Sequence, residues 1–258
     1  TAERILINSR TDRKICARTN LSRISTDALI DKLTKEGIVC ERIDGFDSFY
    51  ITANEGLSNI DSFNQGLFCI QDLSSQRIVN DEVKERLKNA ELVIDVCAAP
   101  GGKTCHIADM AKVLNSGLKI ISRDLTDSKV EKIEENTDRC GFDNVSTCVW
   151  DALREDESLL EKADIVIADV PCSGLGVIGR KVDIKYRVQP EDFISLSSLQ
   201  KEIIDVKDNT VVGLLKGFGF SDKDIEKIYV VYDETNSDIK KLTAAITKTF
   251  ESSDIKSK

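Results

Sequence analysis

The stretch that most constrains the fold is Leu92–Cys105, which reads LVIDVCAAPGGKTC. An apolar run ends at Asp95, Pro100-Gly101-Gly102 breaks the chain, and helical spacing begins at Thr104. A strand, a glycine turn and a helix N-terminus in this order can hold a nucleotide-like group at the carboxyl end of the strand. A plain tight turn is the alternative. The combination of acid, cysteine, proline, glycines and lysine favours the binding turn.

Beyond residue 75 the chain alternates short apolar runs with amphipathic stretches. Strands are expected at 92–96, 118–122, 145–149 and 163–168, and helices at about 74–87, 102–113 and 127–140. Strands separated by helices predict a parallel, doubly wound sheet whose site lies along its carboxyl edge. The expected fold class is therefore α/β, with a Rossmann-like sheet as the core over residues 76–206.

Residues 1–75 are expected to form a separate small α/β module. Strands are predicted at 15–18, 38–43 and 49–52. A helix capped by Ser25 or Thr26 is predicted to run to Lys35, before Gly37. Its expected apolar face consists of Ala28, Leu29 and Leu33.

Four of the expected strands are followed closely by an aspartate: Asp95, Asp124, Asp151 and Asp169. A single such aspartate is usually a turn former or a helix cap. Four in series at one sheet edge favour a shared ligand. Asp124, some twenty-odd residues past the glycine turn, has the position of a carboxylate that accepts ribose hydroxyls.

The nature of the nucleotide follows from charge. The spacing to Asp124 also suits NAD, but the turn lacks G-x-G-x-x-G. Carboxylates repel a pyrophosphate and tolerate a sulfonium cation. These residues therefore point to S-adenosyl-L-methionine as the cofactor.

A second motif is Ala168–Gly176, which reads ADVPCSGLG. Cys172 follows a strand end and a proline, so the backbone should hold it firmly at the sheet edge. A structural role is commoner for any single cysteine. Its place in a crevice loop beside a serine and two glycines favours a functional one.

Composition excludes several classes of protein. The net charge of −9 argues against a nonspecific nucleic-acid coat, and no segment has the length of a membrane span. The eight cysteines form no CxxC pair and His106 is the single histidine, so no metal site is expected. Scattered cysteines suggest reduced thiols in a cytoplasmic protein. The first residue, Thr1, suggests a fragment or a processed chain.

Two clusters of basic residues interrupt the acidic background. One lies within residues 1–23 and includes Arg18, and the other consists of Arg180, Lys181, Lys185 and Arg187. Either cluster alone is most simply interpreted as a solvent-exposed surface without a specific partner. Two clusters that flank one pocket could hold a phosphate backbone.

These motifs together resemble the Sun/Fmu/RsmB-type RNA cytosine-5 methyltransferases, from about Ile15 to Asp205. The resemblance is carried by CARTNLS, GLFCIQDLSSQ, DVCAAPGGKT, ADVPCSGLG and DIKYR, with the strand ends at Asp124 and Asp151. It implies a methyltransferase core preceded by an RNA-binding module, with RNA, most simply ribosomal RNA, as the partner of a monomeric protein. Longer relatives carry a further helical domain before this module.

The resemblance also implies roles for individual residues. The cofactor-binding set would be Cys97, Ala98, Ala99, Pro100, Gly101, Gly102, Lys103, Asp124, Asp151 and Asp169. The catalytic set would be Cys172, Asp169 and Lys103, with Cys172 as the helper in product release and Asp169 against the base. The RNA-binding set would be Arg18, Asn20, Arg180, Lys185 and Arg187.

The family's chemistry needs a thiolate that adds to C6 of cytosine, so that C5 can attack the methyl group. In the family this thiol lies in a Thr-Cys motif after the helix that matches Gln200–Asp205. No cysteine follows Cys172 in this sequence, and Asp233-Glu234 occupies the corresponding place if Ile228–Asn236 supplies the strand. Residues 207–258 are therefore a divergent segment.

Three interpretations follow, in decreasing order of preference. An altered tail leaves a cofactor-binding fold without activity. Alternatively, the chain is a degenerate homologue that binds RNA. In the third interpretation Cys172 itself attacks the base, as the Pro-Cys cysteine does in DNA cytosine-5 methyltransferases.

Overall fold

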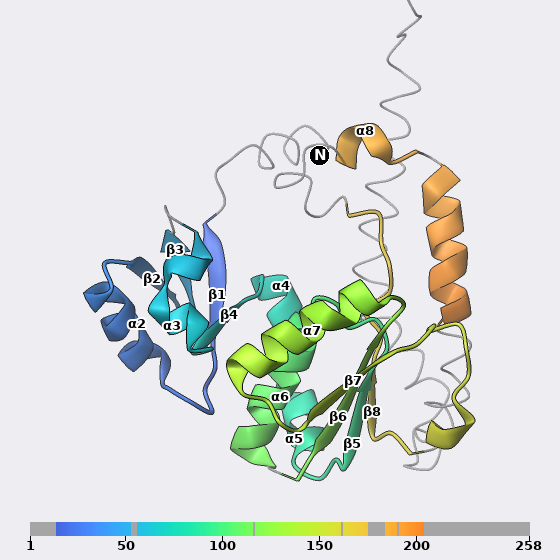
Figure 1. Ribbon diagram of the computed structural model, residues 1–258, viewed down its shortest axis with the longest axis horizontal. Coiled ribbons are helices and arrows are strands. Elements are labelled where there is room, and N and C mark those ends of the chain that lie inside the picture. Colours follow the sequence, from blue (N-terminus) through green and yellow to red (C-terminus); the bar gives the residue numbers. More distant parts are fainter. Residues whose placement is uncertain are drawn as a thin grey trace, which may run out of the picture. The chain divides into compact units, whose positions relative to one another are not determined.

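The computed structural model describes residues 14–52, 56–115, 117–160, 162–174, 184–189 and 191–203. Residues 14–170 form one compact unit, and the described residues from Pro171 onward belong to another. Most of the expected strands and helices lie in the first unit (Figure 1). The segment Ile228–Asn236 lies outside the described residues.

An antiparallel sheet comes first along the chain. Its strands are β1 (Ile15–Thr19), β2 (Val39–Ile43), β3 (Ser48–Thr52) and β4 (Phe68–Ile70), in the order β2-β3-β1-β4. The first three strands agree with the sequence predictions to within a residue at each end. Helix α2 (Thr26–Lys35) follows the predicted cap, since Ser25 accepts a hydrogen bond from the backbone N–H of Ala28. A 3₁₀ turn, η1 (Leu57–Asn59), and α3 (Asp61–Asn64) follow β3.

The two faces of this sheet have different environments. On one face Ala17, Phe49 and Phe68 pack with Leu29 and Leu33 of α2, while Ala28, expected on that apolar face, is exposed. The opposite face carries Arg18, Ser48 and Cys69 in register with one another. These three side chains contact α4, α6 and α7, so both faces of the sheet are covered.

A second sheet is fully parallel, as the alternating pattern predicts. Its strands are β5 (Leu92–Asp95), β6 (Lys119–Asp124), β7 (Val145–Val149) and β8 (Ile165–Ile167). The order β7-β6-β5-β8 places the first strand between the second and the fourth. Successive strands are therefore added first to one side of β5 and then to the other. Open α/β sheets bind ligands at such a point of reversal in strand order.

The helices of this part are α4 (Leu73–Gln76), α5 (Asp81–Leu87), α6 (Gly102–Leu114) and α7 (Asp127–Cys140). The single helix predicted at 74–87 is wrong, because α4 ends at Gln76 and a new helix begins only after Asn80. The side chain of Asn80 accepts a hydrogen bond from Val83 N–H and caps α5. A short 3₁₀ turn, η2 (Glu157–Leu159), precedes β8.

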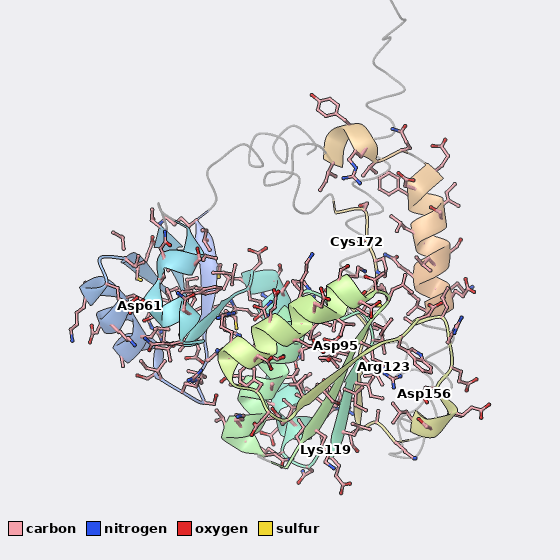
Figure 2. All side chains as sticks on the ribbon, in the orientation of Figure 1. Asp61, Asp95, Lys119, Arg123, Asp156 and Cys172 are labelled. Atoms are coloured by element: carbon pink, nitrogen blue, oxygen red, sulfur yellow. The ribbon has the colours of Figure 1, made fainter. Side chains whose placement is uncertain are left out.

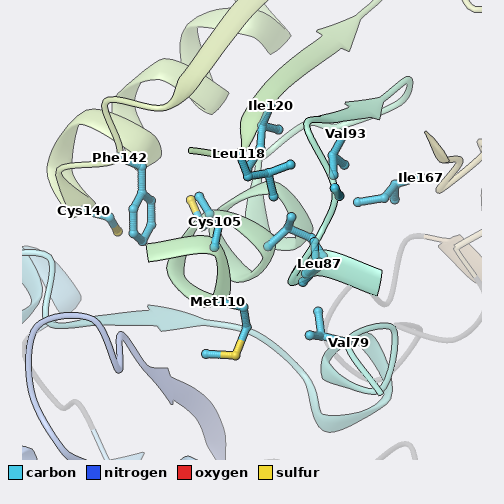
Figure 3. Close-up of a cluster of buried hydrophobic side chains, with 14 of the residues drawn as sticks. Val79, Leu87, Val93, Cys105, Met110, Leu118, Ile120, Cys140, Phe142 and Ile167 are labelled. Carbon is cyan, nitrogen blue, oxygen red and sulfur yellow. The ribbon is translucent and has the colours of Figure 1, made fainter. Parts of the chain in front are cut away.

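Helix α6 is the centre of this unit. Every residue from Thr104 to Ala111 is buried, because α6 contacts β6 on one side and β4 on the other. Its apolar side chains join Leu87, Val93 and Ile120 in one hydrophobic cluster (Figure 3). Since α6 begins directly after the glycine turn, this packing also determines where the turn lies. None of the helices in the described ranges has the length and apolar content that crossing a bilayer requires.

The close approach of the loop before β4 to the last turn of α7 gives a testable stability difference between two glycines. Gly66 and Gly45 have φ angles of 67° and 75°, so alanine is strained at both. A Cβ at Gly66 would lie 2.0 Å from the carbonyl oxygen of Arg139, whereas nothing lies within 4 Å at Gly45. We expect Gly45→Ala to lower the free energy of unfolding by about 1 kcal/mol and Gly66→Ala by about 2 kcal/mol more. Urea denaturation measures both, and equal losses would contradict the contact.

Candidate functional site

The candidate site begins with the loop of residues 96–101, which links β5 to α6. The N–H of Val96 donates to Ile167 O at 3.0 Å, and the N–H of Ala98 donates to Arg123 O at 2.9 Å. These bonds tie the loop to β8 on one side and β6 on the other. The loop therefore has a defined position at the carboxyl edge of the sheet.

Gly101 is required at the end of this loop for two reasons. Its φ of 96° disfavours any side chain, and a Cβ would lie 3.2 Å from Cα of Ile133 in α7. At Gly102, the first residue of α6, no atom lies within 4 Å of a Cβ position. The backbone of Gly102 is thus open to a ligand, which suits the cofactor-binding role predicted for the turn.

Asp124 ends β6 directly beside this loop. One carboxylate oxygen accepts the N–H of Ala99 at 2.9 Å, and the other accepts Leu125 N–H and Lys129 Nζ, both at 2.8 Å. Burial alone would raise the pKa of Asp124, but these hydrogen bonds outweigh it and lower the pKa below its usual value. Asp124 is therefore ionised at neutral pH, as a ribose-binding carboxylate must be.

Asp95 ends β5 and is fully buried (Figure 2). Thr104 Oγ1 donates to Asp95 Oδ2 at 2.8 Å, and Oδ1 has no hydrogen-bond partner. Burial raises the pKa of Asp95 to about 7, opposed by the Thr104 bond and the charge of Lys103. A buried acceptor without a partner, beside the glycine turn, is a feature that a ligand donor or cation would satisfy.

Lys103 and Asp169 form an ion pair across the sheet edge. Lys103 comes from the first turn of α6 and Asp169 from the segment after β8, so the pair spans the reversal point beside β5. Both charges act on Asp95, and the carboxylates of Asp95, Asp124 and Asp169 act on Cys97. The structure thus brings three of the four predicted acids around one loop.

The other three members of the predicted cofactor set have clear local roles. The carbonyl oxygen of Pro100 accepts a hydrogen bond from Asn136 Nδ2 at 2.9 Å. Burial, and then the charges of Asp124 and Asp95, raise the pKa of Cys97 to about 12. Cys97 is therefore a neutral thiol and not a nucleophile. Asp151 accepts the N–H of Leu153 at 3.0 Å and forms a turn after β7, directly after Trp150, whose N–H donates to Asp124 O at 2.9 Å.

The structure places the predicted RNA-binding residues in several environments. Arg18 and Asn20 are buried, at 2% and 0% exposure. Arg18 pairs with Asp109 of α6 at 2.8 Å and donates to Gln71 and Asn20, so Arg18 holds the antiparallel sheet against α6. The side chain of Asn20 donates to the carbonyl oxygen of Gly66. Neither side chain is accessible to RNA in this structure, because both are buried and bonded to partners inside the protein.

Among the described residues, Cys172, Lys185 and Arg187 belong to the second unit. Lys185 and Arg187 belong to the short helix α8 (Ile184–Arg187), and Arg187 is exposed. Arg180 lies outside the described residues. Cys172 is exposed and its thiol is free of a disulfide.

Sequence reasoning missed three residues that shape this edge. Lys129 pairs with Asp124 from the first turns of α7, five residues on, and its half-exposed ammonium group can move away for a ligand. Arg123 pairs with Asp156 at 2.6 Å and lies 4.8 Å from the ring of Trp150 (Figure 2). Lys129 could have been predicted from the sequence, because it stands five residues after a strand-end aspartate. Nothing local indicates the Arg123–Asp156 pair, because 33 residues separate its partners.

The pKa of Asp95 predicts a pH dependence of stability. The folded carboxyl keeps its proton up to about pH 7, whereas the unfolded carboxyl loses it near its ordinary value of 3.8. Between these values the folded state binds more protons, so stability falls as pH rises, and the loss is complete above pH 7. Relative to Asp95→Asn, the wild type should lose about 4 kcal/mol between pH 4 and pH 8. Urea denaturation across this range measures it, with the exposed Asp31→Asn as control; parallel curves for all three proteins would contradict the burial argument.

The parallel sheet, the glycine turn after its first strand and the ionised carboxylate after its second define a Rossmann-like methyltransferase fold. Residues 84–219, just over half of the chain, match the family described as 16S rRNA methyltransferase RsmB/F. The chain belongs to this family, as its motifs indicated.

Individual relatives agree with this membership. The chain is 35% identical over 188 residues to the probable ribosomal RNA small subunit methyltransferase B of Bacillus subtilis, covering 72% of this chain and 41% of that protein. It is 36% identical over 140 residues to ribosomal RNA small subunit methyltransferase F of Klebsiella pneumoniae, covering 54% and 28%. A solved methyltransferase homologue from Pyrococcus horikoshii superposes with a TM-score of 0.65 at 26% identity, over 80% of this chain and 64% of that one. The chain thus spans less than half the length of these curated relatives.

Proposed function

We propose that this chain binds S-adenosyl-L-methionine at the carboxyl edge of β5, β6 and β8, and that it serves methyl transfer to C5 of a cytosine in small-subunit ribosomal RNA. The observation that carries the proposal is Asp124: an ionised carboxylate, anchored by the N–H of Ala99, beside a glycine turn open at Gly102. The relatives reported above are named as ribosomal RNA methyltransferases, which supports ribosomal RNA as the substrate class of this chain.

The residues of the turn fit this cofactor. Asp124 would hold the ribose hydroxyls, and the backbone from Cys97 to Lys103 would face the nucleoside. Bound S-adenosylmethionine would supply an electrophilic methyl group on a sulfonium centre. The carboxylates of Asp124 and Asp169 provide negative charge at the same edge, which favours a cation over a pyrophosphate, and the unpartnered oxygen of Asp95 adds a hydrogen-bond acceptor.

RNA binding would involve the N-terminal module. We propose residues 1–75 as the module that precedes the core, with Arg18 as a positioning residue that holds its sheet on α6 and Asn20 as a partner of Arg18. Direct phosphate contacts fall to exposed cations such as Arg187. The target cytosine must leave its stack to reach a buried sheet edge.

Covalent catalysis in this family requires a thiol, and Cys172 is the last cysteine of the sequence. If its thiolate adds to C6, electrons flow to C5, which takes the methyl group. Loss of the C5 proton then expels the thiolate and restores the base. Because no cysteine follows Cys172 in the sequence to match the family's attacking thiol, we predict slow turnover. A homologue that only binds the cofactor and RNA is the second candidate.

The test is transfer of a tritiated methyl group to small-subunit ribosomal RNA, with nucleoside analysis of the product. C5-methylcytidine that disappears in Cys172→Ala would assign the attack to Cys172. Cofactor and RNA binding with no labelled product would support the second candidate. Label on any atom other than C5 of cytosine would overturn the proposed reaction.

A further inference from the structure

Three cysteines from three separate elements meet in the interior of the first unit. Cys69 comes from β4, Cys105 from α6 and Cys140 from the last turn of α7, and the exposure of each is 4% or less. Their Sγ atoms all lie within 4.8 Å of one another, and those of Cys69 and Cys140 are 3.3 Å apart. Figure 3 shows Cys105 and Cys140 on the helix side of the parallel sheet. The long intervals between them in the sequence gave no sign of this cluster.

The separations suit a shared metal ion. Thiolate sulfurs lie about 2.3 Å from Zn²⁺, so two sulfurs on one tetrahedral ion are about 3.8 Å apart. The Cys69–Cys140 separation of 3.3 Å is shorter than this value and every Sγ separation lies within 4.8 Å, so changes of less than about 1 Å in these separations would bring all three sulfurs onto one ion. No fourth histidine, cysteine or carboxylate ligand joins the group among the described residues. Thiolate ligands in low number select soft d¹⁰ ions such as Cu⁺ and Zn²⁺.

The electrostatic surroundings differ among the three thiols. Hydrogen bonds from Cys105 and Cys140, and then the positive charges of Arg18 and Arg139, lower the pKa of the Cys69 thiol well below its usual range. Hydrogen bonds with the neighbouring thiols and burial raise the pKa of Cys105. The hydrogen bond with Cys105 lowers the pKa of Cys140, but the hydrogen bond with Cys69 and burial outweigh it and raise that pKa. The thiolate is the form of cysteine that binds metals, so a bound ion must displace the protons of these two thiols.

We propose that Cys69, Cys105 and Cys140 bind one thiophilic d¹⁰ metal ion through three thiolates. Cys105 and Cys140 release their protons to solvent as the two further metal–sulfur bonds form, and no electron is transferred. The expectation from the sequence, that no metal site is present, rested on the missing CxxC pairs and the single histidine, and such local criteria could not detect ligands from three elements.

The position of the site gives it a structural consequence. The ion would join β4 of the antiparallel sheet to α6 and α7 of the parallel sheet's helical layer. It would lie on the same helix that starts at the glycine turn, and on the same side as the Arg18–Asp109 pair. Metal binding would therefore hold the two sheets together and raise the melting temperature.

The test uses the full chain, reduced and stripped of metal, titrated without oxygen with Cu⁺ alone and with Zn²⁺ alone. Native mass spectrometry counts the ions retained. We expect one tightly held ion per chain with at least one of these metals, and a rise in melting temperature on loading. Cys105→Ala should weaken retention at least 100-fold. Cys148→Ala, which removes a half-buried cysteine outside the cluster, should retain the ion.

Three results would overturn the proposal. One is no retained ion with either metal in a folded chain. Another is retention that Cys105→Ala leaves unchanged, which would place the ion on other thiols. The third is a Cys69–Cys140 disulfide in the chain purified without reductant, if this disulfide also re-forms in air when either metal is present. That result would show that the two cysteines are a redox pair and not ligands of a metal site. Circular dichroism establishes that each variant is folded.

Discussion

Replacing Asp124 with alanine is expected to weaken S-adenosylmethionine binding by about 100-fold or more. The carboxylate is buried, ionised and held by two backbone N–H groups, so it is oriented before a ligand arrives. A hydrogen bond to a charged group contributes about 1.5–3 kcal/mol, and a ribose offers two hydroxyls to this one group. Loss of about 3 kcal/mol corresponds to roughly a hundredfold change in affinity.

Equilibrium dialysis with labelled S-adenosylmethionine measures the effect. Asp127→Ala is the matched control, because Asp127 is an exposed aspartate three residues further on, in the first turn of α7. Thermal unfolding must show that Asp124→Ala remains folded, since its hydrogen bonds also order the loop. An unchanged dissociation constant in a folded Asp124→Ala protein would remove Asp124 from the cofactor site.

The largest expected loss of stability comes from Arg18→Met. Arg18 and Asp109 are 2.8 Å apart, and their side chains are 3% and 0% exposed. Asp109 also accepts the N–H groups of Leu21 and Ser22. Removing Arg18 leaves a buried carboxylate without its cation, which typically costs about 3–5 kcal/mol of unfolding free energy.

Urea denaturation of Arg18→Met and of Arg42→Met makes a matched comparison. Arg42 pairs with Asp27 at 3.3 Å on the surface, with side-chain exposures of 40% and 84%, so its removal should cost at most about 1 kcal/mol. Similar losses in the two variants would contradict the view that the Arg18–Asp109 pair holds the two sheets together.

The sequence allowed much of the fold to be predicted because its signals are local. The bounds of α7 and β7 agree with the predictions, since Gly141 ends the helix and an alternating run follows it. β8 is shorter than expected, in part because Asp164 accepts the N–H groups of Glu91 and Leu92 and turns toward β5. Local signals of this kind determine an element's type better than its ends.

The interior contacts between the sheets could not be predicted, because they join residues far apart in the chain. Arg18 belongs to the basic cluster within residues 1–23 and to a motif of the family, which suggested a surface that binds RNA. Its partner lies 91 residues away on α6, where an aspartate within a helix has no feature that marks it as buried. The same separation concealed the cysteine cluster. At the site itself the acids were found by their position at strand ends, and Lys129 was missed.

The central claim is that an acidic, glycine-lined sheet edge receives a methyl-donor nucleoside. Calorimetric titration of the unaltered chain with S-adenosylhomocysteine, and separately with NADH, tests it most directly. The structure predicts saturable heat at one site per chain for the first ligand and none for the second. No heat from S-adenosylhomocysteine at millimolar concentration, or saturable binding of NADH at the same edge, would contradict it.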